Sequence, residues 1–324
     1  MKILAISGGT RNGNNDSICK EVLLAAQEEG AETCFIRLLD LELKHCTGCG
    51  FCMRSLNQGH GGACTQKDDF DWLRSQILDA DGVLFSIPVF EKGAAGIFHT
   101  LLDRFGPRSD IGTNLLGKEA AQATGGTPPD PRLFHEKAVA YLGTGGTDYV
   151  TRFQCDCRML SALMLWRTIA CEVFDWTTCF EVENHRIDRA HEIGLALTRA
   201  ARDPAHAPYL GEPGTCSHCG NNNFYLLPNG HAECCICGLK GHLETAEGSL
   251  RFCADSSQLS LAYDTIPGKL HHAADIRRNQ ARRAAIKAST LYRERKRLYM
   301  QLFPPTLPAP NETACPATDT WKEN

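Results

Sequence analysis

Nine of the 17 cysteines in this 324-residue chain fall into two tight clusters. Thiolates spaced two residues apart in a reducing compartment are usually metal ligands. Disulfide frameworks are typical of short secreted chains, and this cysteine content is below the range of such scaffolds. We therefore expect metal chemistry at two places: Cys46, Cys49, Cys52 and Cys64 in the first cluster, and Cys216, Cys219, Cys234, Cys235 and Cys237 in the second.

The spacing of the first cluster favours an iron–sulfur cluster over a single ion. Cys46, Cys49 and Cys52 are too close in sequence for the two knuckles of a simple zinc site. Three thiolates at this spacing can ligate three irons of one four-iron (4Fe-4S) cluster. Cys64, which follows after eleven residues, is the candidate for the fourth ligand. A zinc site and a chain that holds no metal here remain as alternatives.

The second cluster has the spacing of a zinc ribbon, with Cys216-x2-Cys219 and Cys234-x2-Cys237 separated by 14 residues. A glycine follows each pair, which lets backbone N–H groups approach the thiolates. A closed site of four thiolates stabilises a small module and does not catalyse. We expect structural Zn²⁺ here, with a rubredoxin-like iron site as the competitor, and we read Cys235 as a bystander.

A third feature is the run of small and polar residues at positions 7–15, between a first strand and a helix. Such a turn at a helix N-terminus presents N–H groups and the positive end of the helix dipole to a phosphate. The run matches neither the dinucleotide fingerprint nor the P-loop, so a monophosphate such as that of FMN suits it better. The candidate residues are Ser7, Gly8, Thr10, Asn12, Gly13, Asn14 and Asn15.

Short apolar runs alternate with helical patterns from residue 2 to about 203. We expect strands over 3–6, 33–38, 82–88, 138–142 and 168–174, and helices over 14–29, 94–105, 152–166 and 186–202, with a further helix beginning near Asp68 and Asp69. This alternation predicts an α/β fold of the flavodoxin-like type, with a doubly wound five-stranded parallel sheet. The loops after strands one, three and four would then meet at the carboxyl edge of the sheet.

In this order the motifs resemble the NADPH-dependent FMN reductases, and among them the iron–sulfur flavoproteins. The resemblance rests on the phosphate loop, on Cys-x-Gly-Cys-x-x-Cys at 46–52, on the Asp pair at 68–69 and on Leu-Asp-Arg at 102–104. It implies contacts to the flavin ring from two further loops. The residues concerned are Pro88, Val89, Phe90 and Glu91 in one loop, and Gly143, Thr144, Gly145 and Gly146 in the other.

The resemblance also implies a function. FMN would take electrons from NAD(P)H or a ferredoxin-like donor and pass them, with a four-iron cluster relaying single electrons, to a small organic acceptor. A homodimer or homotetramer is implied as well. The chain would thus be an FMN-dependent oxidoreductase. A redox-sensing or nucleic-acid-binding regulator that uses the ribbon and a basic helix is the alternative.

Composition changes divide the chain. We expect a flavodoxin-like domain over 1–203 with the cysteine insertion at 46–64, a linker over 204–215, a zinc-ribbon-like module over 216–251, a basic helical extension over 252–302 and a flexible Pro-rich tail over 303–324. Residues 270–300, expected as a helix, carry nine Lys or Arg against Asp275 and Glu294, a net charge of +7. These basic residues occur on several faces with few aromatics, so we do not expect nucleic acid as the partner.

The overall composition excludes other classes. Hydrophobic residues make up 43% of the chain and the net charge is −4, so the chain has enough apolar material for a core and is not a disordered protein. No run approaches 18 consecutive apolar residues, and we read the first residues as a strand and not as a signal peptide. We therefore expect no membrane partner and a cytoplasmic location.

Overall fold

The computed structural model describes residues 1–246 and 248–306, so most of the expected tail over 303–324 lies outside the described residues. The chain divides into two compact units, Met1–Ala273 and Ala274–Asn324. The first unit contains a sheet whose five parallel strands have the order β2-β1-β3-β5-β6. This is the predicted flavodoxin-like strand order. The strands are β1 (Lys2–Ser7), β2 (Glu32–Arg37), β3 (Gly82–Phe90), β5 (Ala138–Thr144) and β6 (Arg167–Phe174), with the short β4 (Gly93–Ala94) antiparallel to β3.

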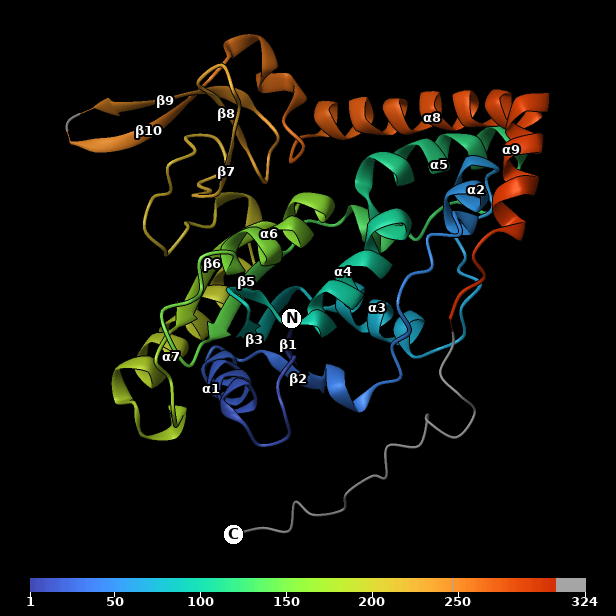
Figure 1. Ribbon diagram of the computed structural model, residues 1–324. Coiled ribbons are helices and arrows are strands. Elements are labelled where there is room, and N and C mark those ends of the chain that lie inside the picture. Colours follow the sequence, from blue (N-terminus) through green and yellow to red (C-terminus); the bar gives the residue numbers. More distant parts are fainter. Residues whose placement is uncertain (247, 307–324) are drawn as a thin grey trace. The chain divides into compact units, whose positions relative to one another are not determined.

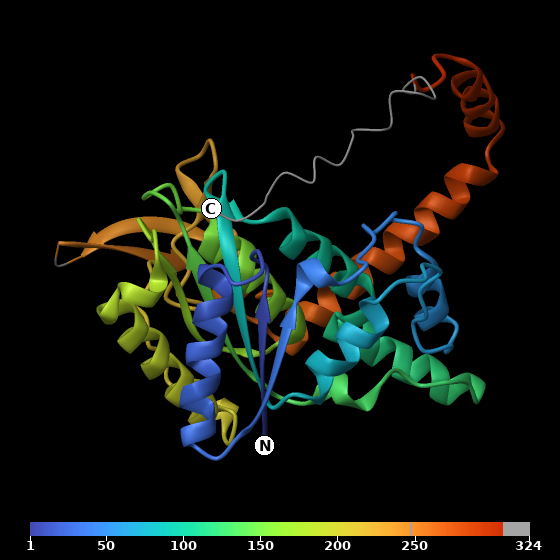
Figure 2. The same ribbon diagram turned by 90° about the horizontal axis from the view of Figure 1, so that it is seen from below.

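The central strands are apolar along their whole length because both faces of the sheet are covered. In β1, Ile3 and Ala5 point into one core while Leu4 and Ile6 point into the other. Helices α1 (Asn14–Glu28) and α7 (Asn184–Ala200) cover the first face, and α3 (Phe70–Asp79), α4 (Gly96–Ser109) and α6 (Phe153–Met164) cover the second (Figures 1 and 2). The strands and helices predicted in this region are confirmed.

Two helices of this region were not predicted from the sequence. Helix α5 (Ile111–Thr124) begins at Asp110, whose side chain accepts a hydrogen bond from the Thr113 N–H, and ends at Gly125 in a left-handed conformation. Both are ordinary helix-end signals. Helix α2 (Phe51–Asn57) lies inside the cysteine insertion and contacts α5. Three 3-10 turns complete this part of the chain: Leu38–Asp40, Pro131–Phe134 and Phe180–Val182.

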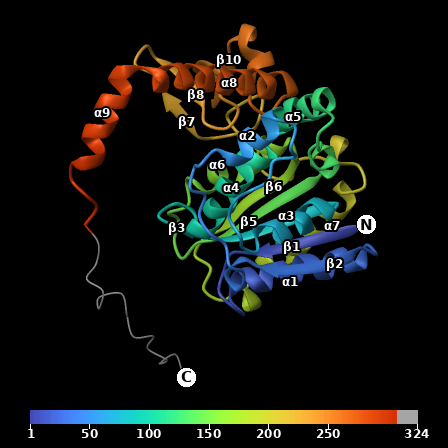
Figure 3. The ribbon, with the colours of Figure 1, turned by 90° about the vertical axis from the view of Figure 1, so that its right-hand side faces the viewer.

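The cysteine-rich module is a second, antiparallel sheet with the order β10-β9-β8-β7. Its strands are β7 (Phe224–Leu226), β8 (His231–Cys234), β9 (Lys240–Ala246) and β10 (Ser249–Ala254), and it is flanked by 3-10 turns at Pro204–His206 and Ser256–Leu261. Phe252 and the buried cysteines share a small core with Ala162 and Met159 of α6. The module therefore packs on the outer side of α6, and Figures 1 and 3 show the two side by side.

The basic segment predicted as one helix over 270–300 is divided into two, α8 (Ile266–Ala288) and α9 (Thr290–Gln301). Ser289 separates them because its side chain caps the second helix, accepting a hydrogen bond from the Tyr292 N–H. The prediction of a single helix was wrong. None of the helices within residues 1–246 and 248–306 is long and apolar enough to cross a membrane.

Candidate functional site

Three loops meet at the carboxyl edge of the parallel sheet, and one buried amide holds them together. The Asn15 side chain donates a hydrogen bond to Ser86 Oγ of β3 (3.1 Å) and accepts one from Thr144 Oγ1 of β5 (3.0 Å). The Gly8 N–H also donates to the Ser86 carbonyl (2.8 Å). The loops after β1, β3 and β5 are therefore fixed relative to each other, as the sequence predicted.

The loop after β1 folds tightly so that the start of α1 faces outward. Asn12 adopts a left-handed conformation (φ 56°), and the Gly13 N–H donates to the Thr10 carbonyl. The space beside Gly8 is filled: an added Cβ would lie 2.9 Å from Ile87 Cδ1. The first N–H groups of a helix have no intrahelical acceptor, so this turn offers donors to an anionic group.

A buried ion pair sits under the same helix start. Arg37 of β2 contacts Asp16 of α1 with two of its nitrogens, and the Asn12 N–H donates to the same carboxylate (2.8 Å). Burial by itself raises the pKa of Asp16, but the hydrogen bonds from Arg37, Ser7 and Asn12 outweigh it and hold the pKa below its usual value. Asp16 is therefore ionised, and its charge is balanced by Arg37 so that it does not repel a phosphate.

The loops after β3 and β5 enclose a groove of about 380 Å³. Apolar, charged and glycine residues line this groove: Val89, Phe90, Glu91, Lys92, Gly145, Gly146, Thr147 and Tyr149. Phe90 and Tyr149 expose 66% and 62% of their surface, and the Lys92 Nζ lies 5.1 Å from the centre of the Tyr149 ring. The groove thus offers two aromatic faces, a cation and a glycine-rich floor.

The structure assigns the residues predicted for flavin contact to two kinds of position. Val89, Phe90, Glu91, Gly145 and Gly146 line the groove. Others build the frame around it. Ser7 Oγ accepts from the Gly9 N–H, Asn14 bonds to Thr178 and Phe180 after β6, Gly143 packs under the Phe153 ring, and Pro88 and Thr144 are paired across β3 and β5.

The four cysteines of the insertion surround a second, smaller cavity. Cys46, Cys49, Cys52 and Cys64 all line a space of about 110 Å³, together with Arg104 and Arg108. Among the described residues, these four do not converge to the distances of a single-ion site. A four-iron cluster binds each thiolate at a different iron, so its ligands surround a volume and do not meet at one point. The donor set and the cavity fit such a cluster. The two arginines that line the cavity are paired with carboxylates, Arg104 with Asp68 and Arg108 with Asp71.

A buried ion pair fastens the loop that carries these cysteines. Arg104 of α4 contacts both carboxylate oxygens of Asp68, donates to the Lys44 carbonyl (2.8 Å) and lies 4.0 Å from Cys64 Sγ. Both side chains are about 98% buried. The Asp pair and the Leu-Asp-Arg segment noted in the sequence therefore form a clamp on the cysteine loop. Asp69 adds a hydrogen bond from the Glu42 N–H (2.8 Å).

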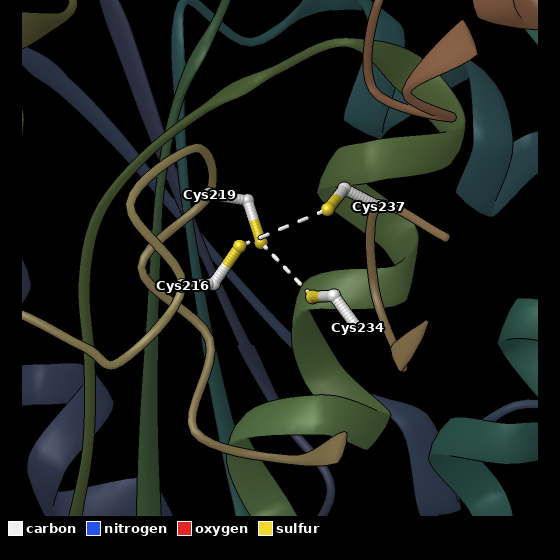
Figure 4. Close-up of side chains that lie close together, drawn as sticks. All are labelled: Cys216, Cys219, Cys234 and Cys237. Atoms are coloured by element: carbon white, nitrogen blue, oxygen red, sulfur yellow. Dashed lines mark hydrogen bonds between the residues drawn. The ribbon is translucent and has the colours of Figure 1, made fainter. Parts of the chain in front are cut away.

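The four ribbon cysteines converge on one point, as Figure 4 shows. Cys216 Sγ lies 3.9 Å from Cys237 Sγ, and Cys219 Sγ lies 3.5 Å from Cys234 Sγ. A tetrahedron with metal–sulfur bonds of about 2.3 Å has sulfur–sulfur edges of about 3.8 Å, so the geometry fits one tetrahedral ion. The buried Asn221 also donates to Cys234 Sγ (3.3 Å), while Cys235 is exposed and points elsewhere.

The ribbon touches the groove loop directly. Asn223 donates from its side chain to the carbonyl of Thr151 (3.0 Å), in the segment that follows Tyr149. The Asn223 carbonyl in turn accepts from the Asn221 side chain and from the Cys235 N–H. The thiolate site and the loop that lines the groove are therefore joined by a short chain of hydrogen bonds.

Sequence reasoning missed several of these residues. Asn223 and the exposed Tyr149 were visible in the sequence, but their partners are distant: Thr151 is 72 residues from Asn223, and Lys92 is 57 residues from Tyr149. The Arg37–Asp16 pair is 21 residues apart and left no local signal. The two residues meet because α1, which carries Asp16, packs against β2, which carries Arg37.

Comparison with known proteins identifies the family of this chain. Residues 1–169 match the family described as NADPH-dependent FMN reductase. The chain belongs to this family. It is an FMN-dependent oxidoreductase, and the match spans the loops after β1, β3 and β5.

Three relatives show which parts of the chain are shared. A solved flavone reductase is 44% identical, with a TM-score of 0.86, over 95% of this chain and all of its own. A flavone synthase of Aspergillus candidus is 23% identical over 91% of this chain and 94% of its own. An iron-sulfur flavoprotein of Methanocaldococcus jannaschii is 38% identical, but the match spans only 36% of this chain and 58% of that protein.

Proposed function

We propose that this protein reduces the conjugated carbon–carbon double bond of a flavone-type substrate, with FMN as its cofactor and NAD(P)H or a ferredoxin-like protein as electron donor. The observation that carries this proposal is the 44% identity to a flavone reductase along nearly the whole chain, ribbon included. The iron-sulfur flavoproteins match between 32% and 47% of the chain. The flavone reductase and the flavone synthase match it along more than 90% of its length.

The groove supports a planar aromatic substrate. Phe90 and Tyr149 present exposed rings, and aromatic pairs stack favourably with planar partners. Lys92 is positioned beside Tyr149 to meet a carbonyl oxygen. Bound FMN would supply hydride chemistry at this groove. The net reaction adds one hydride and one proton across the double bond, at the expense of one NAD(P)H and one solvent proton.

We further propose a four-iron cluster held by Cys46, Cys49, Cys52 and Cys64. The surrounding cavity, its two arginines and the Asp68–Arg104 clamp support it. Such a cluster would let the enzyme accept single electrons as well as hydride. We assign Zn²⁺ to Cys216, Cys219, Cys234 and Cys237, since the sulfur–sulfur distances suit one tetrahedral ion and the site is closed.

The test begins with protein purified without oxygen, in which FMN, iron, sulfide and zinc are counted. We expect one FMN, about four irons and a tetrathiolate zinc per chain. The reduced protein is then mixed with a flavone, and flavin reoxidation and a product two mass units heavier are followed. A flavanone, which lacks the double bond, is the matched control and must not reoxidise the flavin.

The outcomes separate the parts of the proposal. Flavin that is reduced by NAD(P)H and reoxidised by a simple quinone, but not by any flavone, would refute the substrate and keep the oxidoreductase. If the oxidised protein converts a flavanone to a flavone, it works in the direction of flavone synthesis, which is the activity in the name of the Aspergillus relative. Absence of iron would leave the four cysteines of the insertion without the proposed cluster.

A further inference from the structure

The outer face of the ribbon sheet carries a row of metal-ligating side chains that the tetrathiolate site does not use. In the register of the sheet, His231 of β8 lies directly opposite His242 of β9, and His242 lies directly opposite Cys253 of β10. Side chains that are directly opposite in an antiparallel sheet point to the same face, with Cβ atoms about 5 Å apart. Glu244 is two residues beyond His242 and shares that face.

The other face of the same strands is the core of the ribbon. Phe252 and Leu243 are paired in register and pack with Ala232. Because side chains alternate along a strand, the row with Cys253 must face away from this core. The His242 and Glu244 side chains are 55% and 48% exposed, so an ion from solution can reach them.

Three of the four side chains already converge. The ligand atoms of His242, Glu244 and Cys253 lie within 4.8 Å of one another. Cys253 Sγ is 2.9 Å from one Glu244 oxygen, and the His242 Nε2 is 3.7 Å from the other. The edges of a tetrahedral site are about 3.3–3.8 Å for bonds of 2.0–2.3 Å, which matches the separation between His242 and Glu244. The shorter contact is a hydrogen bond from the Cys253 thiol to Glu244, and a bound ion would replace its proton.

We propose that His242, Glu244 and Cys253 form a second zinc site, with His231 as the fourth ligand once its side chain turns toward His242. A thiolate, imidazole nitrogens and a carboxylate oxygen form a mixed set that suits Zn²⁺, whereas Mg²⁺ and Ca²⁺ take oxygen ligands. The thiolate and the carboxylate carry two negative charges, which balance the ion. Arg251, opposite Glu244 on the same face, is the group that competes with the ion for this carboxylate.

A metal at this place would join β8, β9 and β10 on the side away from the ribbon core. The tetrathiolate site holds the knuckles before β7 and after β8, and it includes no residue of β9 or β10. The second ion would therefore stabilise the half of the sheet that the first does not reach. This inference does not depend on the flavin chemistry or on the substrate.

The experiment uses the full-length holoprotein, equilibrated with buffered Zn²⁺ and then passed over a desalting column before metal analysis. We expect one zinc fewer in Cys253→Ser than in the unmodified protein. Calorimetric titration with Zn²⁺ is expected to show at least tenfold weaker binding for His242→Ala and Glu244→Gln. Cys34→Ser and His206→Ala, which change the same residue types elsewhere, are expected to behave like the unmodified protein.

A second measurement uses the unmodified protein, so its result does not depend on whether the variants fold. Zn²⁺ is expected to slow alkylation of Cys253 by iodoacetamide at least tenfold, while the exposed Cys179 of the same molecules reacts at an unchanged rate. The proposed site would be refuted if Cys253→Ser and the unmodified protein contained equal amounts of zinc. It would also be refuted if the rate of Cys253 alkylation were the same with and without Zn²⁺. Unchanged affinity in His231→Ala would overturn its assignment as the fourth ligand.

Discussion

Asn15 is the residue that joins the three loops at the carboxyl edge of the sheet, those after β1, β3 and β5. Its amide satisfies the hydroxyls of Ser86 and Thr144, both of which are buried. Leaving buried hydrogen-bonding groups without a partner costs about 1–3 kcal/mol. A single side chain therefore holds together three segments that are distant in sequence.

We expect Asn15→Ala to lower the free energy of unfolding by about 1–3 kcal/mol, because both hydroxyls lose their partner. The Kd for FMN should rise several-fold, since the loops after β1, β3 and β5 are no longer held together. Urea denaturation and fluorescence titration with FMN measure the two effects. Asn279→Ala, on the exposed surface of α8, is the control. An FMN Kd within twofold of the original would contradict this account of the loop.

Tyr149 is expected to contribute to substrate binding and not to the fold, because it is 62% exposed in the groove. Aromatic stacking contributes about 0.5–1.5 kcal/mol, so Tyr149→Ser should raise the KM for a flavone about 2- to 12-fold and leave FMN content unchanged. Steady-state kinetics with a flavone test this. Tyr225→Ser, which removes an equally exposed tyrosine from the ribbon, should have no effect. Equal KM values for the two variants would exclude stacking on Tyr149.

At the scale of elements, the parallel sheet was predictable because buried strands such as Gly82–Phe90 are continuous apolar runs. The misses have definite causes. Helix α5 is marked by Asp110 and Gly125, but its apolar face is too short to show a period. The single basic helix predicted over 270–300 is two helices because Ser289 caps the second.

The metal-ligating residues were predictable because the sequence spacing of the cysteines in the two clusters is typical of metal sites. The candidate site was not predictable where the fold brings distant residues together. The Lys269 ammonium contacts Asp110 (2.9 Å) across 159 residues. Gly112 is needed beside it, because an added Cβ would lie 2.4 Å from the Lys269 carbonyl oxygen. No local pattern in the sequence contains such a contact.

The packing of α7 on α1 should depend on pH through His191. This residue of α7 bonds to Glu21 (2.8 Å) and Glu28 (3.2 Å) of α1, and these hydrogen bonds raise the pKa of His191 above its ordinary value. A histidine whose pKa is raised by folding adds stability that is fully present below the unfolded pKa of about 6.5. That contribution is lost as the pH rises through the folded-state pKa.

We therefore expect His191→Gln to be destabilised by about 0.5 kcal/mol at pH 5.5, a size typical of partly exposed pairs, and by less at pH 8.5. Urea denaturation of both proteins from pH 5.5 to 8.5 measures the difference. His206→Gln, whose partner Asp203 is only three residues away, is the control. A difference that grows with pH would show that His191 acts in some other way.

At the scale of the whole molecule, the ribbon is built into the first compact unit. It shares a core with α6, and Arg158 of that helix donates to the carbonyls of Cys219 and Gly220 at the first knuckle. Beyond the ribbon, Lys269 joins the start of α8 to α5. Two relatives that match this chain along nearly its whole length are named for flavone chemistry. The ribbon is thus placed to influence the groove and not only its own stability.

The hydrogen-bond chain from Cys234 through Asn221 and Asn223 to Thr151 leads to a last prediction. Cys237→Ser should lose the tetrathiolate ion, because the change removes one of its four thiolate ligands, and the module should then be less stable because such sites owe their folding to the metal. The Kd for FMN should rise several-fold, as the segment after Tyr149 loses its anchor. Zinc analysis, FMN titration and limited proteolysis of residues 204–254 follow the three consequences.

Two variants separate the metal from the hydrogen bond. Cys235→Ser changes the exposed cysteine of the same knuckle and should keep both zinc and FMN affinity. Asn223→Ala should keep the zinc but weaken FMN binding, since it removes only the donor to the Thr151 carbonyl. If Cys237→Ser lost its zinc and still bound FMN as tightly as the unmodified protein, the ribbon would be a stabilising module with no influence on the flavin site.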